Sequence, residues 1–389
     1  GGPGGEAPAA PDAGAPPAGE WRAAWISYIE LQGMDYTSAE AFRAGAAAMM
    51  DRCAGLGLNT VIVQVRPFGD ALYPSALFPW SHICTGVQGV SPGFDPLDIL
   101  LTEAHSRGLS FEGWINPYRL QASASSPGTL AADNLANTHP DWVAAAGGGL
   151  YLNPAIPEAA AYVVEGVAEL VRTYPVDGVH FDDYFYPTTD PAIDAARFAA
   201  SGAADLAEWR RQNVTALVKA AHDAVKAADP TLRFGVSPQG NPDNDMSQQY
   251  SDVRGWLAAG SEDAVVDYLC PQLYWGYGYT LSNGSRRFAY ENILAEWLAM
   301  PRGSAALYVG LGAYRIGEGD GGSNGDSVSG WSTGRALADQ VGTLRAAGAG
   351  GYALYRYGSL FQNTAWPQLA EAECAALTAA NAPDGGRAG

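Results

Sequence analysis

Two adjacent aspartates, Asp182 and Asp183, stand in the segment DGVHFDDYFYP at residues 177–187. Neighbouring carboxylates repel each other, and burial makes the ionised form of each more costly. A chain keeps such a pair where carboxyl chemistry or a cation requires it. Tyr184, Phe185 and Tyr186 follow at once, so we expect aromatic rings around the pair. Carboxyl groups beside aromatic rings suit acid–base chemistry on a sugar, whose apolar face stacks on such rings.

Glycoside hydrolysis typically uses two carboxyl groups, about 5–5.5 Å apart in retaining and about 6.5–9.5 Å apart in inverting enzymes. Asp182 is the first candidate, as nucleophile or base. Asp183 is the nearest choice for the second group, and Asp70 in GDALY is the next. Further acidic residues that the sequence leaves open are Glu112, Asp243 and Asp245.

The elements that must position these residues alternate between strand and helix patterns along the chain. Strands are predicted over residues 22–28, 59–67, 109–117, 177–183, 232–238, 265–275, 306–314 and 351–357. Amphipathic helices are predicted between them, such as 38–57, 157–175 and 205–230, and a final helix over 363–379. This order predicts an α/β fold, a (β/α)8 barrel with enlarged loops at its C-terminal face. The alternative is a doubly wound open sheet, but no GxGxxG follows an early strand.

Active sites of such barrels lie at the C-terminal ends of the strands. Because side chains alternate along a strand, His180 and Asp182 should face the barrel axis, and Val179 and Phe181 the helices. The other predicted strand ends are rich in aromatic, amide and arginine side chains. The candidate sugar-binding residues among them are Arg66, Tyr73, Trp114, Asn116, Tyr118, Arg119, Tyr184, Tyr186, Gln239, Gln272, Tyr274, Trp275, Tyr314 and Arg356, with His180 on the axis.

Composition narrows the function classes. The net charge of −19 in 389 residues argues against nucleic acid and anionic membrane surfaces as partners. The apolar runs are too short to span a membrane. Residues 1–20 are rich in Gly, Pro and Ala and are expected to be a disordered linker. We expect such a linker to tether an exported, envelope-attached protein, with a lipid anchor or signal sequence upstream; an ordinary disordered terminus is the alternative. The barrel is expected over 21–380 and a flexible tail over 381–389.

Other chemistries find little support in the sequence. The five histidines are scattered and the four cysteines lack CxxC spacing, so no metal or other cofactor is expected. No GxSxG indicates a serine nucleophile. Cys53 and Cys374 fall on predicted helices that would be neighbours in a barrel and could form a disulfide, although four separate thiols are the simpler expectation.

Several long motifs together carry a resemblance to a known family. They are WRAAWIS, NTVIVQVRPFGDALYPS, FDPLDILLTEAHSRGLSFEGWINPYR, the NP at 153–154 and DGVHFDDYFYP. The chain resembles the glycosyl-hydrolase-like family 10, a barrel family of bacterial envelope proteins. The resemblance implies hydrolysis of peptidoglycan glycan strands that lack stem peptides. It carries over Arg66, Asp70, Tyr73, Asn116, Tyr118, Arg119, Asn153, His180, Asp182, Asp183 and Tyr184 as site residues.

Two departures limit what is carried over. Glu112 stands where the family often has His or Ala, which makes it a poor candidate for an essential acid. Aligned on the Asp-Gly pair, the catalytic Glu of family 18 chitinases corresponds to Tyr184, so that family's substrate-assisted mechanism is not supported. The main alternative to a hydrolase is a non-catalytic barrel that binds wall glycan, in which the aspartates would hydrogen-bond hydroxyls.

Overall fold

The computed structural model describes residues 13–324 and 327–384. Its central sheet consists of parallel strands in the order β10-β9-β8-β7-β3-β2-β1-β12-β11. The strands are β1 (Trp21–Ile26), β2 (Thr60–Arg66), β3 (Ser110–Ile115), β7 (Gly178–Phe181), β8 (Arg233–Val236), β9 (Tyr268–Leu269), β10 (Ala306–Leu307), β11 (Val309–Gly312) and β12 (Gly351–Tyr355). Each predicted strand is present, so the predicted (β/α)8 barrel is confirmed.

The barrel closes through the predicted strand at 306–314. This segment is divided at Tyr308 into β10 and β11. β10 pairs with β9 on one side, and β11 pairs with β12 on the other. Across the division, the backbone N–H of Tyr308 donates to the carbonyl of Leu269 at 2.9 Å and that of Gly310 to Pro271 at 2.9 Å. The nine strands therefore occupy eight strand positions around one closed barrel, because β10 and β11 share one position. Each strand position is called a stave below.

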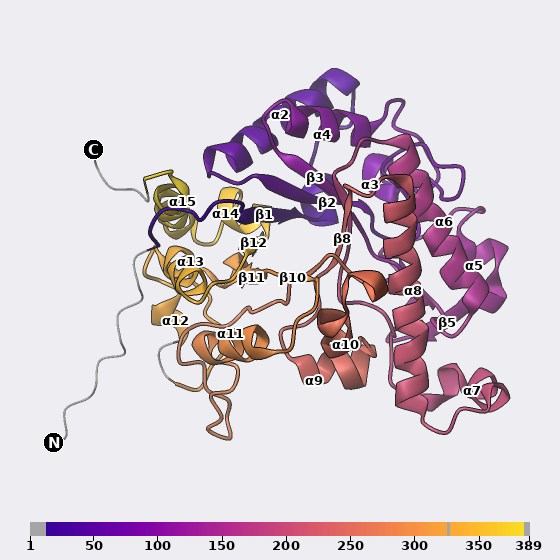
Figure 1. Ribbon diagram of the computed structural model, residues 1–389. Coiled ribbons are helices and arrows are strands. Elements are labelled where there is room, and N and C mark those ends of the chain that lie inside the picture. The colour runs from indigo at the N-terminus through magenta and orange to yellow at the C-terminus, as the bar shows by residue number, and fades with distance from the viewer. Residues whose placement is uncertain (1–12, 325–326, 385–389) are drawn as a thin grey trace.

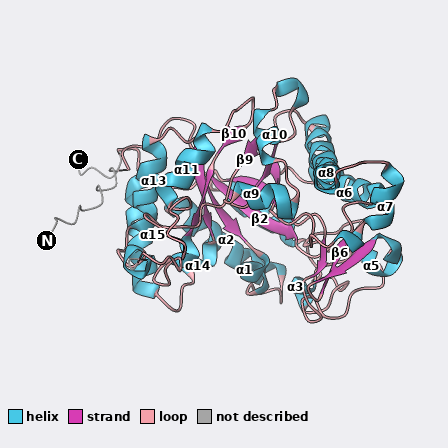
Figure 2. Ribbon diagram, turned by 90° about the horizontal axis from the view of Figure 1, so that it is seen from below, coloured by secondary structure: helices cyan, strands magenta, loops and turns pink. Residues whose placement is uncertain are grey.

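One helix follows each stave and covers the outside of the barrel (Figures 1 and 2); all are long except α10, which has six residues. These helices are α2 (Ala39–Gly55), α4 (Pro96–His105), α6 (Pro157–Thr173), α8 (Leu206–Ala228), α10 (Val253–Ala258), α11 (Tyr290–Ala299), α13 (Ala336–Ala346) and α15 (Pro367–Asn381). Local sequence explains where they begin. The Ser38 hydroxyl accepts from Ala41 N–H, the Asp95 carboxylate from Asp98 N–H and the Asp205 carboxylate from Glu208 N–H. Each contact satisfies a backbone donor that a helix start leaves free.

The enlarged loops carry short elements. The helices are α1 (Tyr28–Gln32), α3 (His82–Thr85), α5 (Leu135–Thr138), α7 (Ala195–Ser201), α9 (Pro242–Asn244), α12 (Ser327–Gly330) and α14 (Tyr357–Phe361). Single helical turns cover Pro140–Trp142, Pro191–Ile193, Asp245–Gln249, Ser261–Asp263 and Ala313–Arg315. A separate antiparallel sheet, in the order β4-β6-β5, consists of β4 (Arg119–Gln121), β5 (Val143–Ala146) and β6 (Gly149–Leu152). Figure 2 shows this small sheet beyond the barrel, next to α5. The sequence analysis did not predict it.

Two apolar cores follow from the alternation of side chains along the strands. Val179 and Phe181 belong to the large core between the sheet and the helices. A smaller cluster fills the barrel itself and is formed by Trp21, Ala23, Trp25, Ile62, Trp114, Tyr268, Cys270, Tyr308 and Ala353. The predicted alternation in the strand that ends in Asp182 is confirmed, because outward and inward residues fall into different cores.

The ends of the barrel differ slightly from the prediction. The predicted linker lies outside the described residues up to residue 12. Within its remainder, Glu20 is buried and binds Arg345 at 2.8 Å. Arg345 also donates to the carbonyl oxygens of Ala13 and Gly14. At the other end, Asn381 is the last residue of α15 rather than the first of a tail, and it is buried.

All four cysteines are free thiols. The possible disulfide between Cys53 and Cys374 is absent, and the Cys374 thiol instead contacts the carbonyl oxygen of Leu360 at 3.5 Å. None of the helices in the described part of the chain combines the length and apolar character needed to cross a bilayer.

Candidate active site

Asp182 lies at the mouth of the barrel, one residue beyond the end of β7. Its side chain is directed inward, where Oδ2 accepts a 2.9 Å hydrogen bond from the indole Nε1 of Trp114 in β3. The backbone N–H of Tyr184 approaches Oδ1 at 3.3 Å. The residue is only 6% exposed. Burial and the neighbouring charge of Asp183 raise the pKa of Asp182 to about 7.

Asp183 occupies a different environment, although it is the next residue. Its Oδ1 accepts a 3.1 Å hydrogen bond from Nε2 of Gln272, which also contacts the carbonyl of Ser237. Burial raises the pKa of Asp183, while hydrogen bonds from Gln272 and Gln239 oppose that rise. Amide donors favour the ionised form of a carboxyl group. Burial and the charge of Asp183 raise the pKa of Asp182, while the amide donors oppose the rise at Asp183, so the pair favours a proton on Asp182 over one on Asp183.

The pair borders a cleft made of two adjoining cavities. The inner cavity, of about 230 Å³, is lined by Trp25, Trp114, Asp182, Asp183, Tyr184, Ser237, Gln272, Tyr274, Tyr314 and Tyr355. The outer cavity, of about 380 Å³, is lined by Asp183, Gln239, Gly240, Asn241, Asn244, Gln272, Tyr274, Trp275, Tyr279, Leu281, Phe288, Tyr314 and Arg315. Asp183, Gln272, Tyr274 and Tyr314 belong to both. Among the described residues, the only carboxyl groups that line the two cavities are those of Asp182 and Asp183.

The structure brings nine of the predicted site residues together in this cleft: Trp114, Asp182, Asp183, Tyr184, Gln239, Gln272, Tyr274, Trp275 and Tyr314. Four lining aromatics were missed: Trp25 of β1, Tyr355 of β12, and Tyr279 and Phe288 of the outer cavity. The signal that could have identified Trp25 is its inward position in WRAAWIS, because it alternates with Ala24 and Ile26 of the outer core.

Arg119 lies near the pair without lining either cavity. Its guanidinium is partly exposed, lies 4.3 Å from the centre of the Phe68 ring and donates to the carbonyl oxygen of Pro67 at 3.3 Å. Its positive charge lowers the pKa of both Asp182 and Asp183, against the larger effect of burial. Arg119 is therefore a nearby cation that favours the ionised form of both candidate catalytic carboxyls.

His180 faces the barrel axis as predicted, but it does not reach the cleft. The residue is completely buried, and both ring nitrogens have partners. Trp25 Nε1 donates to Nε2 at 3.1 Å, and Nδ1 contacts the Tyr268 hydroxyl at 2.8 Å. Burial lowers the pKa of His180 to about 3, so the ring is neutral. The prediction of His180 as a sugar-binding residue is corrected, because Trp25 and Tyr268 occupy both of its nitrogens.

Arg66 and Tyr73 also lie outside the cleft. A register shift between Gln64 and Arg66 in β2 interrupts the alternation there. The Arg66 guanidinium lies 4.1 Å from the centre of the Phe78 ring and against Gly166 of α6. Burial lowers the pKa of Arg66 to about 10. Tyr73 is buried beside Tyr174. Both residues therefore belong to the layer between barrel and helices rather than to a sugar-binding surface.

Asp70 is placed in the loop after β2 and is completely buried. Its carboxylate accepts hydrogen bonds from Phe68 N–H at 3.2 Å and from Gln88 Nε2 at 3.0 Å, and His82 lies 3.7 Å away. These contacts fold the loop on itself. Since Asp70 lines neither cavity, the structure does not support it as the second catalytic carboxyl.

The remaining predicted binding residues are buried or held by other contacts away from the cleft, and the buried hydroxyl of Tyr118 has no hydrogen-bond partner in the described part of the chain. Asn116 accepts from the backbone of Arg119, and Tyr118 is 1% exposed. Asn153 donates to the carbonyl of Ile193, Tyr186 accepts from Asn213, and Arg356 binds Glu30 at 2.6 Å. None of these five lines the inner or the outer cavity.

The three further acidic residues also have clear positions. Glu112 lies inside the barrel, where its Oε1 accepts from the Tyr268 hydroxyl at 2.6 Å, and burial raises its pKa to about 7. Asp243 is exposed and binds Arg287 at 2.5 Å. Asp245 is completely buried and accepts from Gln239 N–H at 2.8 Å; burial and the charge of Asp183 raise its pKa well above the usual range. None of the three lines the cleft.

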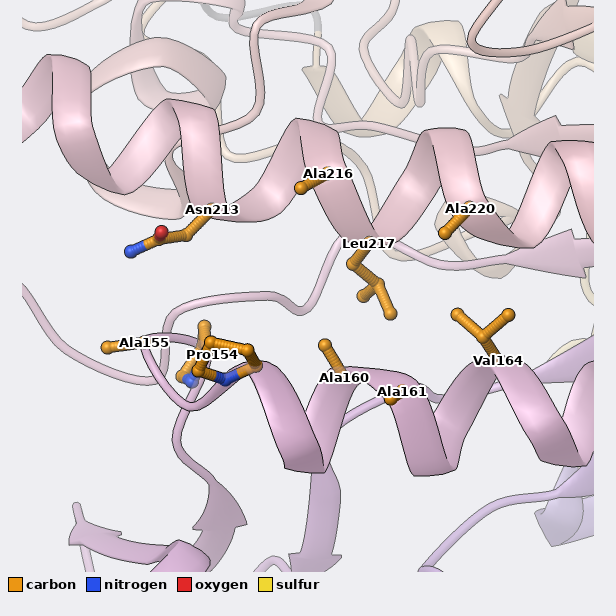
Figure 3. Close-up of a pocket in the computed structure, with 10 residues that line it drawn as sticks. Pro154, Ala155, Ala160, Ala161, Val164, Asn213, Ala216, Leu217 and Ala220 are labelled. Atoms are coloured by element: carbon orange, nitrogen blue, oxygen red, sulfur yellow. The ribbon is translucent and has the colours of Figure 1, made fainter.

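A separate groove of about 370 Å³ lies between α6 and α8 on the outside of the barrel (Figure 3). Its lining is formed mainly by small apolar side chains, with Asn213 as the one amide: Pro154, Ala155, Pro157, Ala160, Ala161, Val164, Asn213, Ala216, Leu217 and Ala220. No titratable group lines it. The groove cannot supply acid–base chemistry, so the cleft at the barrel mouth is the candidate active site.

Known barrel structures resemble this one in fold. The α-L-fucosidase isoenzyme 2 from Paenibacillus thiaminolyticus aligns with a TM-score of 0.57 over 92% of this chain and 49% of its own, at 16% identity. The catalytic domain of β-amylase from Paenibacillus polymyxa aligns with a TM-score of 0.52 over 88% of this chain and 94% of its own, at 12% identity. The structural similarity shows that these proteins share the barrel fold. Sequence identities this low leave the reaction open.

Sequence relatives are considerably closer. Glycosyl hydrolase YngK of Bacillus subtilis is 38% identical over 323 residues, which are 76% of this chain and 61% of the relative. Glycosyl hydrolase DigH of Escherichia coli K12 is 36% identical over 299 residues, 69% of this chain and 65% of the relative. The chain thus spans less than two thirds of these relatives. The profile of the glycosyl hydrolase-like 10 family matches residues 20–324. The chain therefore belongs to the glycosyl hydrolase-like 10 family.

Proposed function

We propose that this chain hydrolyses glycosidic bonds in bacterial cell-wall glycan, with peptidoglycan strands that lack stem peptides as its substrate. The observation that carries the proposal is the pair of adjacent carboxyls, Asp182 and Asp183, at the border of an aromatic cleft. Their surroundings differ, so that Asp182 is protonated more readily and Asp183 is ionised more readily. A hydrolase of this type needs one protonated and one ionised carboxyl group at the same pH.

Burial and the charge of Asp183, which raise the pKa of Asp182, favour it as the general acid, and the amide donors on Asp183 favour that residue as the carboxylate that acts as base or nucleophile. Asp182, whose pKa is raised to about 7, gives its proton to the glycosidic oxygen as the bond to the anomeric carbon breaks. Asp183, held by Gln272, faces both cavities and so lies where the reacting bond would cross between them. These roles reverse the expectation from sequence, which had Asp182 as nucleophile or base.

The cleft also suits the chemistry of the proposed substrate. The rings of Tyr184, Tyr274, Trp275 and Tyr314 offer surfaces on which pyranose faces stack. The amides of Gln239, Asn241 and Asn244 can bind hydroxyl and acetamido groups. Because this polymer lies outside the cytoplasmic membrane, we propose an exported, envelope-associated location.

Release of reducing ends from peptide-free glycan strands tests the proposal. We expect the parent protein to cut, and Asp182→Asn and Asp183→Asn each to lose about 10²–10⁴-fold in rate while keeping the parental melting temperature. The matched control is Asp51→Asn, since Asp51 is an exposed aspartate of α2 that pairs with Arg107. A parent protein that binds the strands and never cuts them would favour the non-catalytic glycan-binding barrel.

A further inference from the structure

We propose that a third cavity, next to the cleft at the end of β12, is an additional sugar-binding subsite in which Trp366 is the stacking platform. The inference rests on the proposed glycan substrate and extends it, because it predicts that the chain prefers long strands over short fragments. Trp366 lies beyond the residues matched by the family profile.

The third cavity, of about 220 Å³, adjoins the cleft at Tyr314. It is lined by Tyr314, Ile316, Glu318, Arg356, Gly358, Ser359, Gln362, Asn363, Thr364, Ala365 and Trp366. Tyr314 lines all three cavities and is 37% exposed, so its ring separates the third cavity from the other two. We infer that a polymer bound in the cleft extends past Tyr314 into this cavity.

Trp366 has the geometry of a rigid platform. Its ring packs on Gly317, whose φ is +72°, and a Cβ at that position would lie 2.3 Å from Trp366 Cδ2. The indole Nε1 donates to Glu318 Oε1 at 2.8 Å, and the backbone N–H donates to Asn363 Oδ1 at 2.7 Å. The side chain is nonetheless 39% exposed. A large ring held at its edge and over a glycine, with so much surface open, is suited to stacking against an apolar sugar face.

The chemistry of the other lining residues suits a neutral, hydroxylated ligand. Ser359 and Thr364 carry hydroxyls, while Gln362 and Asn363 carry amides. The two charged residues of the lining already have partners: Arg356 binds Glu30 and Glu318 accepts from Trp366. A phosphate or a metal ion would find no uncommitted charge among these side chains, whereas a pyranose requires a ring and hydroxyl partners.

The experiment measures binding and cleavage as a function of strand length. Peptide-free glycan strands are separated by size, and the affinities of a two-sugar fragment and of strands of about eight sugars are measured in the Asp183→Asn background, where cutting is blocked. We expect Trp366→Ala to weaken binding of the long strands by roughly five- to tenfold and to leave the two-sugar fragment unchanged. Trp366→Phe, which keeps a ring face and loses the bond to Glu318, should retain most of the affinity.

Two further variants separate stacking from a general effect on folding. Trp366→Leu keeps an apolar side chain over Gly317 and should show the same length-dependent loss as Trp366→Ala. The matched control is Trp209→Ala, because Trp209 is a partly exposed tryptophan in α8 that packs against Phe198 of α7, outside the three cavities. Equal weakening at both lengths, or no weakening at either, would overturn the subsite.

The result also separates this inference from the proposed reaction. If the parent protein binds long strands through Trp366 and never cuts them, the subsite stands and the hydrolase proposal fails. If the parent cuts and Trp366→Ala cuts long and short strands at the parental rates, the hydrolase proposal stands and the subsite fails.

Discussion

Trp114 Nε1 donates a 2.9 Å hydrogen bond to Asp182 Oδ2, and this bond joins two neighbouring staves of the barrel at its mouth. The indole orients the carboxyl group and, as a donor, favours its ionised form, so it opposes the rise in pKa that burial causes. The same ring lines the inner cavity. One side chain therefore both positions the candidate acid and forms part of the lining of the inner cavity.

Replacing Trp114 by Phe should lower kcat for strand cleavage by roughly tenfold, because a hydrogen bond to a buried carboxyl group is lost. Loss of the donor also raises the pKa of Asp182 further, so the alkaline limb of the rate profile should move to higher pH. The control is Trp256→Phe, since Trp256 donates at 2.9 Å to Thr215 in the outer core. An alkaline limb that stays in place or moves to lower pH would contradict the role of Trp114.

The pH dependence of kcat/KM follows from the raised pKa of Asp182. As a general acid, Asp182 is active in its protonated form, so cleavage should decline as pH rises through about 7. Asp183 must be ionised, so cleavage should also decline on the acid side. Initial rates across pH 4–9 at low strand concentration measure both limbs. Rates that keep rising above pH 8 would rule out Asp182 as the acid.

Glu112 should make the parent protein less stable at high pH. Burial raises the pKa of Glu112 to about 7 in the folded chain, against about 4.3 in unfolded peptides. Between these values the unfolded chain releases its proton while the folded chain keeps it, so stability falls as pH rises, by up to about 1.4 kcal/mol per pH unit. Glu112→Gln cannot ionise and still accepts from Tyr268.

We therefore expect Glu112→Gln to match the parent in melting temperature at pH 4, below the unfolded pKa, and to exceed it at pH 8. Thermal unfolding followed by circular dichroism measures both. The comparison with the parent cancels the contributions of the other carboxyl groups, which the two proteins share. Equal melting temperatures at pH 8 would show that Glu112 does not carry this cost.

The buried ion pair between Arg210 and Asp194 should be important for stability. Arg210 of α8 binds Asp194 at 2.7 Å, and both side chains are completely buried. Arg210 also donates to the carbonyl oxygens of Thr189 and Asp190, in the loop that follows the paired aspartates. Arg210→Ala would leave the Asp194 charge without its partner, which costs about 3–5 kcal/mol in unfolding free energy.

Chemical denaturation of Arg210→Ala and of Arg211→Ala measures this difference. Arg211 is the next residue and pairs on the surface with Glu208 at 3.1 Å, so its replacement should cost less than about 1 kcal/mol. Similar losses for the two variants would contradict the importance assigned to the buried pair.

The sequence was sufficient to predict the barrel because its periodic patterns are local. Each stave appears as a short apolar run between turn residues, and Asp205 and Asp95 start helices through contacts with backbone groups only three residues away. The small sheet of β4, β5 and β6 was missed because its short strands are paired across loops. The pairing of β4 with β6 joins residues far apart in the sequence, such as Arg119 and Tyr151, whereas β5 and β6 form a local hairpin.

The alternation of side chains placed Asp182 and Trp114 at the barrel mouth, and it also placed His180 on the axis. It could not show that Trp25 and Tyr268, from staves distant in the sequence, would occupy both ring nitrogens of His180. Arg66 was misplaced for a different reason. The register shift in β2 is a departure from regular pairing with β3, and no local sequence pattern predicts it.

The sequence by itself determined the order of strands and helices, the closed α/β barrel and the presence of two adjacent carboxyls at one strand end. These features depend on periodicity and on residues that are neighbours in the chain. Only the tertiary structure decided which polar side chains face the cleft, that Asp183 receives amide donors while Asp182 accepts from Trp114, and that Trp366 and Tyr314 line the same cavity. Those features depend on distances between staves and on burial, because a carboxyl group's protonation is governed by the groups that surround it in space.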